Sequence, residues 1–450
     1  MLVIPLLFFL SACVKYKSLC VAATELTNLS HPHSRLLAHC QHPESRYLVT
    51  FHPGIHRHEW LPESGATIRR SWSFGSFQGA NLHFSTRKAC EQFWEKTTAE
   101  QAKFPDEWMH VQVDCEAAVK GFEANPPWVG YALLKGHLAR RLVANLPFFF
   151  WQNLDRVDQK RLPLDGGYTY PDSAGKGVDI YIVDTGININ HTEFEGRAKW
   201  GITTSSTDPA RIDDHGHGSH VAGIAGGKTF GTSKLSTLIA VKALASNGSG
   251  PYSDVIDGLS WVARAASRSG RPSVVNLSVE GENSPTFNAA LSGILDLDIH
   301  VVCAAGNSGE DACLSSPAAL TAQKPAISVS AIDRYDNMPS FSNYGRCVLL
   351  TAPGVDVLSV LYTSNSGAVT MSGTSMAAPH VTGVIANLLS MNQTNNGSDN
   401  ASASVDENGT AIPRDPAGMR QYLVQNAGTA NGNLVNATRG ALAGVLWNGF

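Results

Sequence analysis

The chain has 450 residues, of which 43% are hydrophobic and only 16% are charged, so it can bury a sizeable core. Its 34 basic and 38 acidic side chains nearly cancel to a formal charge of −4, which excludes the strong basic field of nucleic-acid-binding and membrane-surface proteins. The only long apolar run stands at the very start, so a polytopic membrane protein is also excluded.

Residues 1–23 predict a signal peptide. The apolar stretch at 2–10 is too short to span a bilayer, and the small residues at 21–23 provide a cleavage site. Because no basic residue precedes the apolar stretch, a buried N-terminal segment remains an alternative. Residues 10–13 also resemble a bacterial lipoprotein box, which the same missing charge disfavours.

Residues 45–120 predict a small α+β unit, with strands at 47–51 and 109–113 and a helix at 86–95 between them. Residues 121–145 have the composition of a linker and processing region. They contain Asn125-Pro126-Pro127 and the dibasic pair Arg140-Arg141.

Residues 146–450 predict one large domain, because short β-rich runs alternate there with helical patterns. Largely apolar strands are expected at 178–183, 238–244, 273–279, 299–304 and 326–331. Helices are expected at 254–267, at 288–297 and from about 373 to 391. Such strands are typical of a parallel sheet that helices cover on both faces.

The stretch at 392–412 is almost free of apolar residues and predicts a polar surface insertion. Four glycosylation sequons crowd into it, at Asn392, Asn396, Asn400 and Asn408. Asn276 is also in a sequon, but it lies in an apparently buried strand, so we expect it to be unmodified.

Three cysteines lie within the large domain, so at most one internal disulfide can form there. Cys313 and Cys347 are the expected pair, because both lie in loop-like sequence. Cys303 lies inside the apolar run at 301–304, where a buried and inert thiol is the common outcome.

Three segments carry the residues of chemical interest. Asp184 ends a buried strand in the run at 181–187, His217 stands among small residues at 213–223, and Ser375 opens a helix at 373–380. Taken singly, each has an ordinary structural interpretation: a carboxylate that caps a turn, a solvated loop histidine and a helix N-cap.

Two other chemistries fit parts of these segments. Asp184-Thr185-Gly186 matches the triplet of aspartic proteases, but that chemistry needs two such carboxylates and this chain has one. His215, His217 and His220 have the spacing of a zinc cluster in metallo-β-lactamase-type hydrolases. That cluster has Asp where this chain has Ser219, and no downstream ligand cluster follows, so no metal site is predicted.

Together, in the order Asp, His, Ser, the three segments resemble the subtilisin superfamily of serine endopeptidases. The resemblance is closest to the proteinase K and cerevisin-type branch, through residues 246–250, 304–307 and 341–345. It covers nearly all of 165–390 and implies an α/β fold, a three-layer domain with a parallel sheet covered by helices. It also implies a peptidase that needs no cofactor.

The resemblance assigns a role to each residue. Ser375 would be the nucleophile, His217 its general base and Asp184 the carboxylate that orients the imidazole. Asn307 and the helix N-terminus at Ser375 would stabilise the oxyanion. Substrate would bind as an added strand, and the residues expected to contact it are Gly248, Ser249, Gly250, Ser278, Val279, Glu280, Gly281, Ala304 and Gly306.

The chain departs from the family at two positions. Glu280 replaces a glycine that lies against the substrate backbone, so it should either favour basic side chains or obstruct binding. Leu349 stands where proteinase K-like relatives have a calcium-binding Asp, so we expect no strong calcium dependence from that site.

Residues 46–54, 74–79 and 83–85 resemble the subtilase propeptide, a folding chaperone and inhibitor, although 111–119 lacks a clean family-like tail. A generic α+β unit is the alternative. Self-cleavage is expected between about 141 and 151. The resemblance thus implies a monomeric zymogen, secreted or vacuolar, that acts on polypeptides and binds neither nucleic acid nor membrane. The competing hypothesis is a catalytically weak homologue that acts as a protein-binding module.

Overall fold

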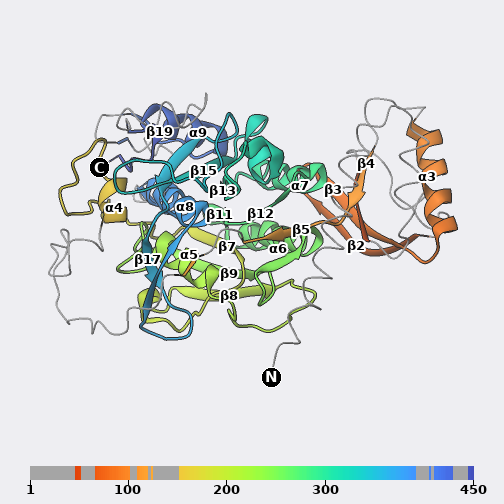
Figure 1. Cartoon of the computed structure of the whole chain (residues 1–450), viewed down its shortest axis with the longest axis horizontal. Coiled ribbons are helices and arrows are strands. Elements are labelled where there is room, and N and C mark those ends of the chain that lie inside the picture. The colour runs from red at the N-terminus through yellow and green to blue at the C-terminus, as the bar shows by residue number, and fades with distance from the viewer. Residues whose placement is uncertain are drawn as a thin grey trace, which may run out of the picture.

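The computed structural model describes residues 46–51, 66–101, 109–119, 123–124, 152–391, 405–406, 410–428 and 444–449. Three expectations lie outside these residues: the signal peptide, cleavage between 141 and 151, and the four clustered sequons. The described residues form a small unit up to residue 119 and a large unit from residue 152 onward, which lie against each other (Figure 1).

The large unit is built around one parallel sheet. Within the described residues this sheet has eight strands, and every neighbouring pair runs parallel. In spatial order the strands are β19 (Gly444–Val445), β16 (Leu350–Pro353), β15 (Ile327–Ile332), β13 (His300–Ala304), β11 (Ser273–Leu277), β7 (Asp179–Asp184), β9 (Thr237–Lys242) and β8 (Ala198–Thr203).

Helices cover both faces of this sheet. Those of one face are α5 (His217–Gly226) and α8 (Thr374–Met391), and those of the other face are α6 (Tyr252–Ser269) and α7 (Pro285–Leu295). Successive residues of a strand point to opposite faces, so in β7 Ile182 enters the first hydrophobic core and Val183 the second. A strand buried on both faces needs no polar side, which explains the continuous apolar runs. The predicted three-layer α/β fold is confirmed.

All five predicted strands of the large unit are present, with bounds that differ by a few residues. The expected helix at 288–297 instead begins at Pro285, because the Ser284 side chain caps it by accepting from the N–H of Phe287 and proline suits the first turn. Three strands of the large sheet, β8, β16 and β19, were not predicted. The other elements of the large unit that were not predicted are α4 (Gln152–Val157), η3 (Thr192–Phe194), β10 (Ser249–Pro251), β12 (Glu280–Glu282), η4 (Ala312–Leu314), β14 (Ser315–Ser316), η5 (Ala318–Ala322), β17 (Val357–Val360), β18 (Ala368–Ser372) and α9 (Pro416–Gln425).

The small unit is an antiparallel sheet with one helix. Its strands are β1 (Arg46–Phe51), β2 (Ala66–Phe74), β3 (Phe77–Phe84) and β4 (Met109–Val113), in the spatial order β2-β3-β1-β4. Its helix is α3 (Arg87–Gln101). The sequence predicted β1, β4 and the helix but missed the hairpin of β2 and β3, because β2 mixes polar and charged residues with few apolar ones.

The two faces of the small sheet have different partners. Val49 and Phe93 pack together in a core between this sheet and α3, whereas Leu48 and Trp72 join the core that contains α6 and α7. Asp114 accepts a hydrogen bond from the N–H of Ser253 in the first turn of α6, at 3.0 Å. Burial raises the pKa of this carboxyl to about 6. The small unit therefore docks through one apolar sheet face and one helix N-terminus.

The cysteine predictions hold. Cys313 and Cys347 form a disulfide, with their Cα atoms 5.3 Å apart. Cys303 is a free, fully buried thiol, and burial raises its pKa, so the reactive thiolate is disfavoured.

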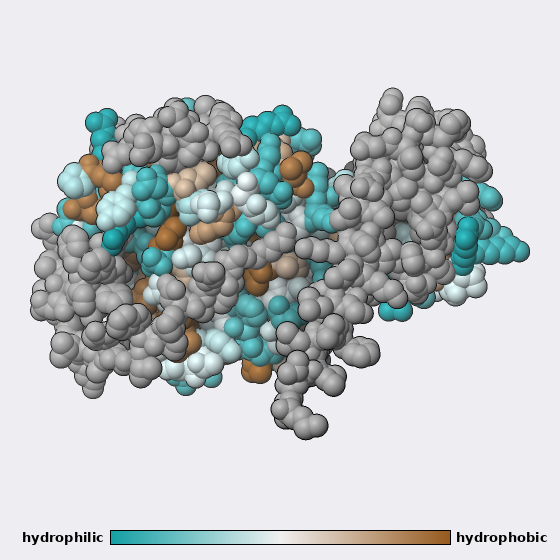
Figure 2. Space-filling model, viewed as in Figure 1, coloured by the Kyte–Doolittle hydropathy of each residue, from teal (hydrophilic) through white to brown (hydrophobic). Residues whose placement is uncertain are grey.

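The described surface is of mixed polarity. On the face drawn in Figure 2, hydrophobic residues form mostly small, separate spots among hydrophilic ones. In the parts of the chain that the structure covers, we find no helix both long and apolar enough to cross a membrane.

A buried ion pair ties α4 to the loop after β15. Arg156 donates from Nε to one carboxylate oxygen of Asp336 at 2.7 Å and from Nη2 to the other at 3.2 Å. Both side chains are about 1% exposed. Removal of one partner from such a pair leaves the other charge buried without compensation.

We therefore expect Asp336→Ala to destabilise the fold by about 3–5 kcal/mol. Glu195→Ala, which breaks an exposed pair with Lys228, should cost less than about 1 kcal/mol. Thermal unfolding of both variants beside the wild type measures this. Equal melting temperatures for the two variants would contradict the assignment.

Candidate active site

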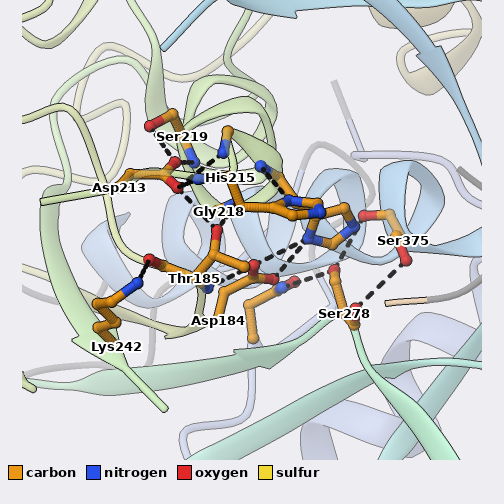
Figure 3. Close-up of polar contacts among 12 residues, drawn as sticks. Asp184, Thr185, Asp213, His215, Gly218, Ser219, Lys242, Ser278 and Ser375 are labelled. Atoms are coloured by element: carbon orange, nitrogen blue, oxygen red, sulfur yellow. Dashed lines mark hydrogen bonds and ion pairs between the residues drawn. The ribbon is translucent and has the colours of Figure 1, made fainter. Parts of the chain in front are cut away.

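Three neighbouring strands end at the same edge of the parallel sheet, and each delivers a polar residue there. Asp184 is the last residue of β7, Ser278 directly follows β11, and Asn307 lies three residues after β13. The carboxyl edge of an open parallel sheet is the usual place for a ligand site. Figure 3 shows Asp184, Ser278 and Ser375 gathered there.

His217 is bound to Asp184 at the start of α5. Its Nδ1 lies 2.8 Å from Oδ1 and 2.9 Å from Oδ2 of the carboxylate, and both side chains are almost fully buried. A carboxylate only accepts, so Nδ1 must carry the proton and Nε2 is the basic nitrogen. The N–H of Thr185 also donates to Asp184, at 2.7 Å, and fixes the carboxylate.

The loop before α5 is organised by the buried carboxylate of Asp213. It accepts from the hydroxyl of Thr185 at 2.9 Å and from the N–H groups of Gly216 at 2.8 Å and Ser219 at 2.9 Å. A negative charge is favourable at a helix N-terminus. The Thr185 hydroxyl in turn accepts from the N–H of Gly218 at 3.0 Å, so the end of β7 and the start of α5 are joined (Figure 3).

A hydrogen bond from Ser278, next to the end of β11, holds the backbone of Ser375. Pro379 lies inside α8 and has no N–H to donate to the carbonyl of Ser375, four residues earlier. The hydroxyl of Ser278 donates to that carbonyl instead, at 2.9 Å, and itself accepts from the side chain of Asn276 at 2.9 Å. The Ser375 hydroxyl donates to the carbonyl oxygen of Ser278 at 3.3 Å.

The side chain of Asn307 is oriented by the residue before Ser375. Its Oδ1 accepts from the N–H of Thr374 at 2.8 Å and from the Thr374 hydroxyl at 3.0 Å. These two donors assign Oδ1 and leave Nδ2 as the donating end of the amide. Ser375 also lies in the first turn of α8, where backbone N–H groups have no acceptor within the helix.

His215 and His220 lie near His217 in the chain, but the contacts described for them differ from the bond between His217 and Asp184. Burial, followed by the proximity of His217, lowers the pKa of His215, whose ring centre is 6.3 Å from that of His217. His220 is fully buried, and burial lowers its pKa to about 3. Its Nε2 lies 3.0 Å from the carbonyl oxygen of Val369.

A strand of the small unit lies between the two segments expected to bind substrate. β5 (Glu116–Ala118) pairs antiparallel with β10 (Ser249–Pro251) on one side and β12 (Glu280–Glu282) on the other. Beyond it, the N–H of Val119 donates to the carbonyl of Gly248 at 3.0 Å. The stretch 111–119, which lacked a family-like tail in the sequence, thus forms the middle strand of this cleft.

Close approach explains one glycine of the cleft. A methyl group at Gly281 would lie 2.7 Å from the backbone oxygen of Glu116 and 2.3 Å from the hydroxyl of Tyr252, so a side chain there would displace β5. Of the other residues expected at the cleft, Gly248 precedes β10, and Ser249 and Gly250 lie in it. Ser278 and Val279 lead into β12, which begins at Glu280, whereas Ala304 ends β13 and Gly306 follows it.

Glu280 contacts two different segments. Its backbone pairs with Ala118 of β5, whereas its side-chain carboxylate binds the loop that carries Asn307. It is only 3% exposed. A peptide strand can therefore pair with this segment with the glutamate in place.

A second short strand of the N-terminal segment pairs with the strand that leads to Ser375. β6 (Glu123–Ala124) pairs antiparallel with β18, which ends three residues before Ser375. Glu123 is the partner of Ser372. The N-terminal segment is thus held at two places, by β5 between β10 and β12 and by β6 beside the strand that precedes Ser375.

At the position of the family's calcium ligand, Leu349 is buried in the main hydrophobic core. Among the described residues, no group of three or more His, Cys, Asp or Glu is arranged to hold a metal ion.

Sequence reasoning assigned no role to Asp213, Asn343 or Thr374, which position the loops of the site. Each stands inside a quoted motif, which was the available signal. Their contacts join segments far apart in the chain, and no local pattern predicts such contacts.

The comparisons with known proteins agree with this geometry. The model of the subtilase family matches residues 175–441, which include Asp184, His217, Asn307 and Ser375. The crystal structure of a cold adapted subtilisin-like serine proteinase is similar, with a TM-score of 0.56 and 37% identity, over 66% of this chain and 97% of that one.

Curated relatives are similar over the same region. The extracellular serine proteinase of Thermus sp. is 48% identical over 52% of this chain and 55% of its own length. The subtilisin-like serine protease Pen ch 18 of Penicillium rubens is 45% identical over 50% of this chain and 46% of its own length. Cerevisin of Saccharomyces cerevisiae is 43% identical over 50% of this chain and 36% of its own length. The chain thus spans about half the length of these relatives, or less. The resemblance seen in the sequence is confirmed, and because the family model covers more than half of the residues, the chain belongs to the subtilase family.

Proposed function

We propose that the protein is a serine endopeptidase that hydrolyses peptide bonds in polypeptides through Asp184, His217 and Ser375. The observation that carries this proposal is the pair of hydrogen bonds from Nδ1 of His217 to Asp184, made at the same sheet edge where Ser278 anchors Ser375. The relatives named as serine proteinases support the same reaction.

The proposed reaction follows from these positions. The basic Nε2 of His217 removes the proton of the Ser375 hydroxyl as its oxygen attacks the substrate carbonyl carbon. The N–H of Ser375 and Nδ2 of Asn307 stabilise the resulting oxyanion. His217 then gives the proton to the departing amine as the peptide bond breaks. Water, deprotonated by His217, hydrolyses the acyl-enzyme and restores Ser375.

We infer that the small unit is a propeptide that blocks the site and is cut there by the protein itself. β5 occupies the cleft between β10 and β12 as an extended substrate would. β6 lies beside β18, so the peptide bonds between Val119 and Glu123 are those flanked by both strands. This supports a first cut within 119–123, upstream of the cut that the sequence suggested at 141–151.

The first 23 residues suggest export, and one relative is named an extracellular serine proteinase. None of the relatives' names points to a vacuole. The alternative of a catalytically weak homologue that acts as a protein-binding module rested on Glu280 and on the poor match of the N-terminal unit to a propeptide. The pairing of β5 with Glu280 and Gly281 speaks against obstruction by that glutamate.

Expression of the full chain beside its Ser375→Ala variant tests activity and self-cleavage together. We expect the wild type to yield a new N-terminus between residues 120 and 123, and Ser375→Ala to stay uncut at that point, because no nucleophile remains. N-terminal sequencing of both products reads this out. A wild type that stays full length would refute self-cleavage, and a first cut after residue 140 would refute the assigned bond.

Asn307→Ala tests the oxyanion donor. We expect kcat to fall about 10²–10³-fold with little change in KM, the size of effect known for the equivalent donor of subtilisin. Steady-state hydrolysis of a peptide p-nitroanilide by the processed protein measures both constants. A kcat within a few-fold of the wild type would show that Asn307 does not contact the transition state.

A further inference from the structure

The buried carboxylate of Glu280 binds the loop that follows β13. Oε2 accepts from the backbone N–H of Asn307 at 3.1 Å, and Oε1 accepts from the hydroxyl of Ser308 at 3.1 Å and from Nδ2 of Asn343 at 3.2 Å. The glutamate is 3% exposed. Hydrogen bonds to a charged acceptor are stronger than those between neutral groups, and burial strengthens them further.

The same loop is held from its other side by Asn343. Its Nδ2 also donates to the carbonyl of Ala305 at 3.0 Å, and its Oδ1 accepts from the N–H of Ser308 at 3.0 Å. Gly306 has φ +107°, and a methyl group there would lie 2.6 Å from Oε1 of Glu280 and 2.2 Å from Nδ2 of Asn343. At Gly306 the loop thus packs against both Glu280 and Asn343, with no room for a side chain.

Glu280 and Thr374 fix Asn307 at two different points. Glu280 holds its backbone N–H, and Thr374 holds its side-chain Oδ1. With both ends held, Nδ2 has one direction in which to donate. A donor that is already in place when the oxyanion forms needs no reorganisation during the reaction.

We propose that Glu280 is a positioning residue that preorganises the oxyanion hole by holding Asn307 through its backbone. This inference rests on the proposed peptidase activity and assigns Glu280 a role in turnover. It differs from the role expected from the sequence, which placed the glutamate against the substrate as a specificity group or an obstruction.

The variant Glu280→Gln tests this role, because the contacts of Glu280 require a side chain that only accepts hydrogen bonds. Glu280→Gln keeps the size of the side chain but replaces one acceptor with an NH2 donor. Asn343 Nδ2 is committed as a donor by its bond to Ala305, and the N–H of Asn307 cannot accept. In either orientation the NH2 group of the glutamine therefore faces another donor, either the N–H of Asn307 or Nδ2 of Asn343. We expect this conflict to displace the loop. A misplacement of about 1 Å can cost about 10²-fold in rate.

The test compares four processed proteins on one peptide p-nitroanilide: the wild type, Glu280→Gln, Asn307→Ala and the double variant. We expect Glu280→Gln to lower kcat by about 10–10²-fold with KM within about twofold. In the Asn307→Ala background the same substitution should change kcat by less than about twofold, because the group that Glu280 positions is gone.

Glu310→Gln is the matched control, since it removes an exposed carboxylate from the same loop and should leave both constants unchanged. Should Glu280→Gln not fold, Ser308→Ala removes one donor to Oε1 and should lower kcat about threefold, again only when Asn307 is present.

Three results would overturn the proposal: a Glu280→Gln kcat equal to the wild type, an effect confined to KM, or equal losses with and without Asn307. The first leaves a buried carboxylate without influence on turnover, the second makes it a substrate-binding group, and the third makes its effect independent of the oxyanion donor. In each case an active wild type and an inactive Ser375→Ala would still support the peptidase itself.

Discussion

The parallel direction of β7, β11 and β13 is the constraint on which the site depends. Because the three strands run the same way, they deliver Asp184, Ser278 and Asn307 to one edge of the sheet. Helices α5 and α8 begin at that edge with His217 and Ser375 near their first residues. The polar groups are then joined by short hydrogen bonds in a buried environment, where each bond is stronger than it would be in water.

The burial of the site also explains its dependence on supporting residues. A buried polar group without a partner is costly, and the carbonyl of Ser375 would be one because of Pro379. Ser278 removes that cost and at the same time sets the position of Ser375, the proposed nucleophile. Asp213 accepts in the same way from N–H groups at the start of α5, those of Gly216 and Ser219. The same hydrogen bonds therefore give buried polar groups their partners and hold the residues of the proposed site in place.

Much of this could be predicted from the sequence, for identifiable reasons. Five of the eight described strands of the large sheet lie in largely apolar runs that marked their positions, whereas β8, β16 and β19 were missed. The odd cysteine count and the loop context gave the pairing of Cys313 with Cys347. The hairpin of β2 and β3 was missed because β2 has no clear period. The cleft strand β5 was missed because three residues become a strand only through pairing with β10 and β12, which are distant in the chain. The direction of the Glu280 side chain was likewise beyond sequence reasoning. The position of Glu280 opposite a substrate strand was foreseen, whereas its contacts depend on how the loop after β13 folds back.

The central claim is that Ser375 is a nucleophile activated by His217. Covalent labelling with an organophosphonate that reacts only with activated serine hydroxyls, followed by peptide mass mapping, tests this most directly. We predict one adduct per processed molecule, located on Ser375, and none in the His217→Ala variant. A processed, folded wild type that hydrolyses peptides but carries no adduct at Ser375, or equal labelling in His217→Ala, would contradict the account.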